Sequence, residues 1–349
     1  MRKVYALIVT FAIILTSYLY ITKTTEPAPI LKNTGEAISL LISKIAECES
    51  SPIEKRDQCI LLVLKNEVKV SSTTETARRF IAASSQDKFV ARNCHTISHL
   101  FGRWAWETDS EASYIKGIDG CSFGYYHGLL EKLASESFEK MLILSKEICV
   151  TASSGVELGG CIHGVGHAVA MTGESTNRFS ELCNRVTDQK EMVLECFRGS
   201  IMMWSELNPG TKAADIADLC SKFSDEFAGK CIDGLVYDIQ DLEQLALIDD
   251  YCSDALASSA RDCWFSSGGA VAARIVFSGA KLSLLQDVCS GNFTCLESAG
   301  YHLVAGGSQD VGYSTKVCRS LNPSDSEICI EGVVRAKNQF KNDPGFLIG

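Results

Sequence analysis

Five of the six histidines in this chain lie within 73 residues, at His95, His99, His127, His163 and His167. Two pairs have the spacing His-x3-His, and residues four apart share one face of a helix, so both imidazoles of a pair can reach one ion. His127 is followed four residues later by Glu131, which adds a carboxylate to the same face. Imidazole and carboxylate are common ligands of zinc, iron and copper. We therefore predict that the five histidines hold a transition metal or a non-covalent haem, with Glu131 as a further ligand or a catalytic base.

The same cluster allows two other interpretations. A histidine near the start of a helix can simply bond a backbone carbonyl of a neighbouring repeat and serve packing. A group of imidazoles beside a carboxylate can also perform acid–base catalysis without a metal. His302 lies far along the chain and is interpreted as structural, unless the chain closes into a ring that brings it back. Glu107 is a further carboxylate in the segment that follows His99.

The elements that must position these side chains are repeats. A pattern of Cys-x2-Gly followed by an apolar stretch begins at Cys121, Cys161, Cys196, Cys231 and Cys329. Copies that lack the glycine begin at Cys59, Cys94, Cys263 and Cys295. The intervals between successive copies are 35, 27, 40, 35, 35, 32, 32 and 34 residues, a period that fits one pair of helices per unit. His99, His127 and His167 lie five, six and six residues after their opening cysteines, so stacked repeats are expected to align them in a row.

A second cysteine precedes most of the opening ones. It ends one helical pattern, the opening cysteine begins the next, and an antiparallel hairpin brings these two ends within disulfide distance. The predicted pairs are Cys48/Cys59, Cys149/Cys161, Cys183/Cys196, Cys220/Cys231, Cys252/Cys263, Cys289/Cys295 and Cys318/Cys329. Cys94 and Cys121 remain and are expected to pair with each other. The predicted fold is therefore all-α, an α-solenoid or closed α/α toroid of about nine disulfide-linked hairpins.

The N-terminal segment indicates export. Residues 4–21 carry no charge and are mostly apolar, which predicts a signal anchor or a cleaved signal peptide. Arg2 and Lys3 precede this segment, so the positive-inside rule places residues 1–3 in the cytoplasm and the remainder outside it. Residues 22–35 are expected to form a linker, 36–340 the helical-repeat domain and 341–349 a tail. The 16 cysteines agree with an oxidising compartment such as the periplasm, the cell surface or a secretory lumen.

The composition of the chain indicates which classes of partner it can bind. The net charge is -10 and no basic run is present, which excludes a nucleic-acid partner because phosphate binding needs clustered Lys and Arg. The N-terminal segment predicts membrane attachment. The alternative function is a repeat scaffold whose surface binds a protein, peptide or glycan, with histidines that serve only packing.

Overall fold

The computed structural model describes residues 34–108, 120–121, 123–150, 152, 155–208, 213–237, 252, 260–277, 280–308 and 311–340. Every regular element in these ranges is a helix. The predicted cytoplasmic residues 1–3, the apolar segment 4–21, most of the linker and the tail lie outside them. Among the described helices, none combines the length and apolar character needed to cross a bilayer.

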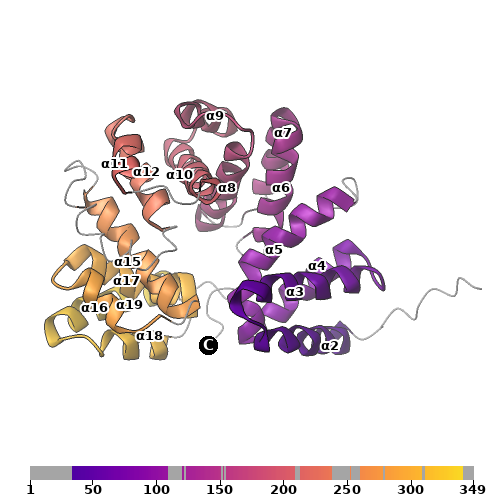
Figure 1. The fold of residues 1–349 in the computed structure, drawn as a ribbon, viewed down its shortest axis with the longest axis horizontal. Coiled ribbons are helices and arrows are strands. Elements are labelled where there is room, and N and C mark those ends of the chain that lie inside the picture. The colour runs from indigo at the N-terminus through magenta and orange to yellow at the C-terminus, as the bar shows by residue number, and fades with distance from the viewer. Residues whose placement is uncertain are drawn as a thin grey trace, which may run out of the picture.

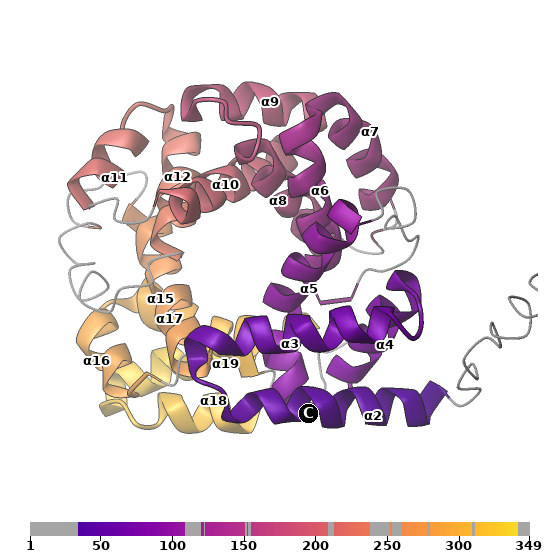
Figure 2. The ribbon, with the colours of Figure 1, turned by 45° about the vertical axis from the view of Figure 1, so that its right-hand side comes forward.

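Eight of the described helices surround a common centre, and we call them the inner helices (Figures 1 and 2). They are α5 (Lys88–Thr108), α6 (Gly124–Glu136), α8 (Gly155–Ala170), α10 (Lys190–Leu207), α12 (Asp225–Tyr237), α15 (Ala260–Phe277), α17 (Phe293–His302) and α19 (Pro323–Phe340). Each packs against the next one along the chain. Figure 2 shows that they follow one another around the centre.

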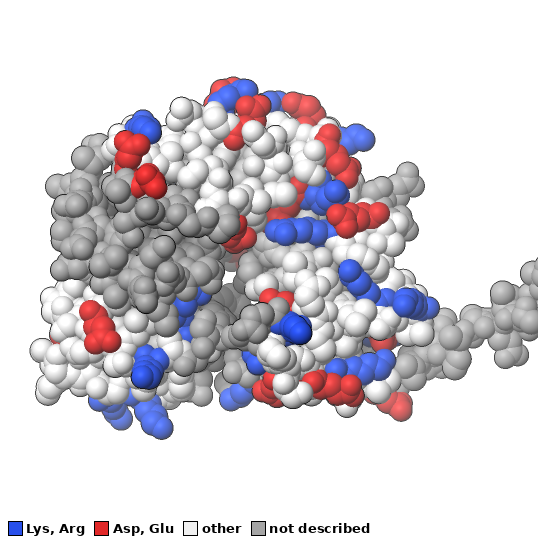
Figure 3. Space-filling model, viewed as in Figure 1, with Lys and Arg blue, Asp and Glu red and all other residues white. Residues whose placement is uncertain are grey.

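The other helices lie outside this ring. They are α7 (Phe138–Cys149), α9 (Phe179–Val186), α11 (Ala213–Cys220), α16 (Ser283–Cys289) and α18 (Val311–Cys318). At the N-terminal end, α2 (Thr34–Ala46), α3 (Ile53–Val68) and α4 (Thr73–Ser84) pack together and against α5. Short helical turns occupy Glu47–Ser50, Thr176–Arg178 and Leu303–Ser308. In the face shown in Figure 3, acidic and basic side chains are intermixed over the outer surface.

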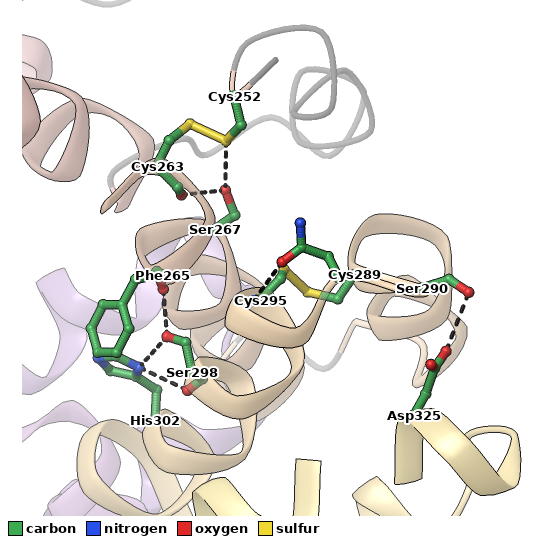
Figure 4. Close-up of a disulfide and its surroundings, with 11 residues drawn as sticks. Cys252, Cys263, Phe265, Ser267, Cys289, Ser290, Cys295, Ser298, His302 and Asp325 are labelled. Carbon is green, nitrogen blue, oxygen red and sulfur yellow. Dashed lines mark hydrogen bonds between the residues drawn. A yellow bond between two sulfur atoms is a disulfide. The ribbon is translucent and has the colours of Figure 1, made fainter. Parts of the chain in front are cut away.

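All 16 cysteines form disulfides, and the eight pairs are those predicted from the sequence, Cys94–Cys121 included. Seven of them join the end of an outer segment to an inner or following helix over six to 13 residues. Figure 4 shows two of these links, Cys252–Cys263 and Cys289–Cys295. Eight disulfides agree with an oxidising, extracytoplasmic location.

The recurring glycine lets inner helices approach closely. A Cβ at Gly199 would lie 2.1 Å from the carbonyl oxygen of His163, and one at Gly332 would lie 1.9 Å from that of Glu297. In both cases the glycine stands three residues after one opening cysteine, and the carbonyl two residues after the previous one. Ser298 replaces the glycine in a degenerate copy, and its hydroxyl donates to the equivalent carbonyl of Phe265 (Figure 4). The glycine therefore sets the distance between neighbouring inner helices.

Candidate metal centre

Three consecutive inner helices supply a two-by-three array of donor side chains. Each helix contributes a pair of residues four positions apart: His95 and His99 from α5, His127 and Glu131 from α6, and His163 and His167 from α8. The first members, His95, His127 and His163, line a pocket of about 640 Å³. The second members lie one turn deeper, and His99, Glu131 and His167 are 8%, 0% and 3% exposed. The structure thus brings together all five predicted histidines and Glu131.

Glycines make this crowding possible. A Cβ at Gly128 would lie 1.9 Å from the carbonyl oxygen of His99, so α5 and α6 can touch only because this side chain is missing. A Cβ at Gly164 would lie 1.8 Å from Cδ2 of His127, so that imidazole occupies the space the glycine leaves. The imidazole rings of His95, His99 and His127 consequently have centroids 4.7–5.3 Å apart.

The nitrogens of His95, His99 and His127 converge on one point. Nε2 of His99 lies 3.2 Å from Nε2 of His95 and 3.0 Å from Nδ1 of His127. Donor atoms from the three residues all lie within 4.8 Å of one another. Two ligands of a tetrahedral ion at ~2.0–2.1 Å are separated by distances of this order. We call these three residues the histidine triad.

The opposite nitrogen of each ring is already engaged. Nδ1 of His95 lies 2.9 Å from the carbonyl oxygen of Cys121, and Nε2 of His127 lies 3.1 Å from that of Gly160. A carbonyl only accepts, so both nitrogens carry their protons there and the converging nitrogens present lone pairs. Nδ1 of His99 lies 3.1 Å from Oε1 of Glu131 and is fixed in the same way. Metal-binding histidines in proteins are oriented by such bonds to carbonyls and carboxylates.

The backbone before α6 is strained where it serves this site. Cys121 and Phe123 have φ angles of 56° and 61°, in the left-handed region that residues with side chains rarely adopt. The Cys94–Cys121 disulfide holds this turn against α5. As a result the carbonyl of Cys121 meets the ring of His95, which suggests that the strain is maintained to place that oxygen.

Glu131 is the shared partner of the deeper row. Its Oε1 accepts from Nδ1 of His99 and lies 3.3 Å from Nδ1 of His167, and its Oε2 accepts from Nε of Arg103. His99, Glu131 and His167 form a second group close enough to hold an ion. Burial alone would raise the pKa of Glu131, but His99 and His167 outweigh burial and hold that pKa well below its usual value. Glu131 is therefore a carboxylate with three donors around it.

His163 and His167 extend the network away from the triad. Their Nε2 atoms lie 3.1 Å apart, and Nδ1 of His163 is buried with no hydrogen-bond partner among the described residues. If Nδ1 of His167 donates to Glu131, then Nε2 of His163 must donate to His167. The unpartnered Nδ1 of His163 is then a lone pair, which costs less than an unpartnered N–H.

Protonation of His95, His127 and His163 is disfavoured in the folded protein. Burial lowers the pKa of His127 well below its usual value, and the imidazoles of His99 and His95 act in the same direction. Burial, then the charge of Arg198, lowers the pKa of His163. Desolvation of the imidazole and then His99 lower the pKa of His95 to about 3. Neutral imidazoles are the form that binds metals.

His302 faces the same central space from a different wall. It lines a second pocket of about 450 Å³, together with Arg198 and Lys230, which also line the pocket of the triad. Its Nδ1 lies 2.9 Å from the carbonyl oxygen of Ser298 and 3.1 Å from the Ser298 hydroxyl, so it bonds within its own helix (Figure 4). The ring arrangement brings it toward the cluster but not into the triad.

Sequence reasoning missed several residues of the site. Arg103 follows His99 by four residues on the same helix face, so the spacing that linked the histidines could have revealed it. The carbonyls of Cys121 and Gly160 carry no signal in the sequence. Glu107, a candidate carboxylate, instead lies near Lys132, with Oε1 and Nζ 3.5 Å apart.

No protein-family model, no characterised protein and no solved structure with which this chain was compared matches it.

Proposed function

We propose that this protein is an extracytoplasmic metal-binding protein, and that the ion is held by His95, His99 and His127. The observation that carries the proposal is the convergence of three lone pairs whose rings are fixed from behind. Without an ion, three lone pairs face one another, because the single proton of each neutral ring is already engaged at its opposite nitrogen. An ion satisfies all three at once.

Charge favours the histidine triad over the second group. Glu131 already accepts from His99 and Arg103, so it is neutralised before any ion arrives. An ion bound between His99, Glu131 and His167 would displace the protons on both imidazole nitrogens. Nε2 of His167 would then carry a proton toward His163, and Nδ1 of His163 would become a buried N–H without a partner. Glu131 therefore orients His99 and is not itself a ligand.

The geometry favours a bare ion over haem. A haem iron takes axial ligands on opposite faces of a wide planar ring. Here three donor nitrogens lie within 4.8 Å of one another, and no macrocycle fits between them. Nitrogen donors of this kind suit zinc, copper or iron.

Three protein ligands beside a pocket leave a coordination position for a water or another small molecule. An ion in such a site supplies Lewis acidity that activates water or polarises a bound ligand. The protein contributes neutral imidazoles, the carboxylate of Glu131 that orients His99, and a pocket that admits the ligand. Hydrolysis is the chemistry these groups support best.

The finer architecture and location form part of the same proposal. The inner helices and their outer partners constitute an α-solenoid of repeated hairpins whose ends approach to form a ring. Residues 4–21 would tether this ring to a membrane, with the repeats outside the cytoplasm. Intermixed surface charge and a net charge of -10 support the expectation that nucleic acid is not a partner.

The test is metal content by mass spectrometry, with the full chain expressed in an oxidising compartment. We expect one ion per chain, and we expect His127→Ala to lose it while the helix content is retained. His302→Ala is the matched control, because it removes a partly buried imidazole outside the triad and should retain the ion. A folded protein that stays metal-free after incubation with zinc, copper and iron would refute the proposal and leave the repeat scaffold for a protein, peptide or glycan. Turnover that survives chelation would instead favour metal-free acid–base catalysis.

A further inference from the structure

The pocket beside the triad is lined on one side by glycines that packing does not explain. Gly155, Gly159 and Gly160 all lie at the N-terminal end of α8 and line the pocket with His95 and His127. A Cβ added at any of the three would meet no atom of the residues that the structure describes within 4 Å. None of them has a positive φ, so no turn requires glycine here.

Glycines elsewhere in the inner helices differ in this respect. Cβ atoms at Gly128, Gly166 and Gly300 would lie 1.9–2.0 Å from carbonyl oxygens of neighbouring helices. Those glycines are required by the approach of two helices. Glycine inside a helix is unfavourable relative to alanine, so three of them in one helix without a packing role need another reason. Their common property is that they keep one wall of the pocket free of side chains.

The charges around the pocket indicate what it accommodates. Its lining includes two acidic side chains, Glu191 and Glu195, and two basic ones, Arg198 and Lys230. Glu195 bonds Lys230 at 2.9 Å and Arg198 at 3.0 Å, and Asp233 lies 3.7 Å and 3.6 Å from the same two groups, so both basic groups are already compensated. The positive end of the 16-residue helix α8 lies at the glycine wall. A divalent ion on three neutral imidazoles would add two positive charges, of which Glu191 in the lining can balance one.

We infer that this pocket binds a ligand through an oxyanion group, a carboxylate or a phosphate, placed between the ion and the glycine wall of α8. The inference rests on the proposed metal site, because the lining has no net charge until an ion is bound. Backbone N–H groups at a helix N-terminus and a cation are complementary to such a group. The glycines allow the ligand to approach the helix backbone closely.

The first test separates a pocket role from a structural one. Gly159→Ala should raise the melting temperature by about 2 °C, because alanine favours the helix and has free space here. Gly128→Ala is the contrasting variant and should lower the melting temperature, because its methyl group would collide with the carbonyl of His99. A lowered melting temperature for Gly159→Ala would show that Gly159 serves packing and would overturn the inference.

The second test uses the cobalt(II)-loaded protein, whose visible spectrum reports a change of ligand. Acetate and inorganic phosphate are the anionic probes, and imidazole is the neutral one. We expect one of the anions or both to change the spectrum, and the preferred anion to identify the ligand class. Gly159→Leu should weaken anion binding roughly tenfold or more, because its side chain fills the pocket, while cobalt affinity stays within about twofold.

The outcomes separate the two proposals. If cobalt binds and imidazole changes the spectrum but neither anion does, the metal site stands and the oxyanion inference fails. Unchanged anion binding in Gly159→Leu has the same consequence. If cobalt does not bind at all, both proposals fail.

Discussion

Replacement of Glu131 by glutamine tests whether this carboxylate orients a metal ligand or is itself a ligand. Glu131 is fully buried, and its two oxygens accept from His99 and Arg103 and lie near His167. Glu131→Gln preserves size but removes the charge, and one end of its amide can only donate. Either Arg103 or the imidazole of His99 therefore loses its acceptor.

The expected magnitude follows from these contacts. Loss of an orienting partner weakens metal binding about 10–100-fold, or ~1.4–2.7 kcal/mol. Breaking a fully buried ion pair costs about 3–5 kcal/mol of folding free energy. The Arg103 side chain is 36% exposed and can be hydrated once unpaired, so we expect a smaller loss of about 2 kcal/mol.

Two measurements on Glu131→Gln show whether Glu131 orients a ligand or is one. Zinc affinity is measured by competition with a chromophoric chelator, and stability of the metal-free protein by urea unfolding. Glu136→Gln is the matched control, since Glu136 lies on the same helix with its side chain 52% exposed, and it should leave both quantities unchanged. Complete loss of zinc from Glu131→Gln would mean that Glu131 is a ligand in the second group. Wild-type affinity together with wild-type stability would refute the network as described.

Three further predictions concern pH, packing and disulfides. The pKa of His127 is lower in the folded protein than its ordinary value of 6.5, so below pH 6.5 the unfolded chain binds a proton that the folded chain does not. Each such buried histidine therefore lowers the free energy of unfolding by about 1.4 kcal/mol for every unit by which the pH decreases. Urea unfolding of the metal-free protein between about pH 7 and 5 measures this slope, and a stability that does not change with pH contradicts the prediction. Gly128→Ala should lower the free energy of unfolding by about 1–3 kcal/mol, because its methyl group would lie 1.9 Å from the carbonyl oxygen of His99. Unchanged stability of this variant would argue against the close contact of α5 and α6. Removal of the Cys183–Cys196 disulfide, whose cysteines are 13 residues apart, should lower the free energy of unfolding by about 3 kcal/mol in the same assay. Non-reducing peptide mapping that finds these two cysteines as free thiols would contradict both the fold and the exported location.

The helices and their links are largely readable from the sequence. An apolar helical period, a polar turn and two cysteines 11–13 residues apart leave few alternatives, because a short loop and the geometry of a disulfide restrict each hairpin locally. The repeat period likewise aligned Cys94 and Cys121, which remained after the short pairs were assigned. These predictions depend on residues near one another in the chain.

The position of the recurring glycine is visible in the sequence, but its contact is not. Its place after each opening cysteine was visible, but the carbonyl it approaches belongs to the previous repeat, as for Gly199 and His163. Gly159 lies outside this pattern, two residues before Cys161. That a Cβ there would meet no atom of the described residues within 4 Å is visible only once the neighbouring helices are placed.

The candidate site shows the same division. Matched places after the opening cysteines predicted that His99, His127 and His167 lie together, and the four-residue spacing on a helix added His95, His163 and Glu131. Which nitrogen of each ring is available depended on partners from other helices, such as the carbonyls of Cys121 and Gly160. The sequence by itself thus determined the helices, the disulfides and the membership of the cluster, because those follow from local spacing. The tertiary structure decided which three histidines converge, why Glu131 lies behind them and where the pocket opens, because hydrogen bonds and free space depend on how separate helices are placed.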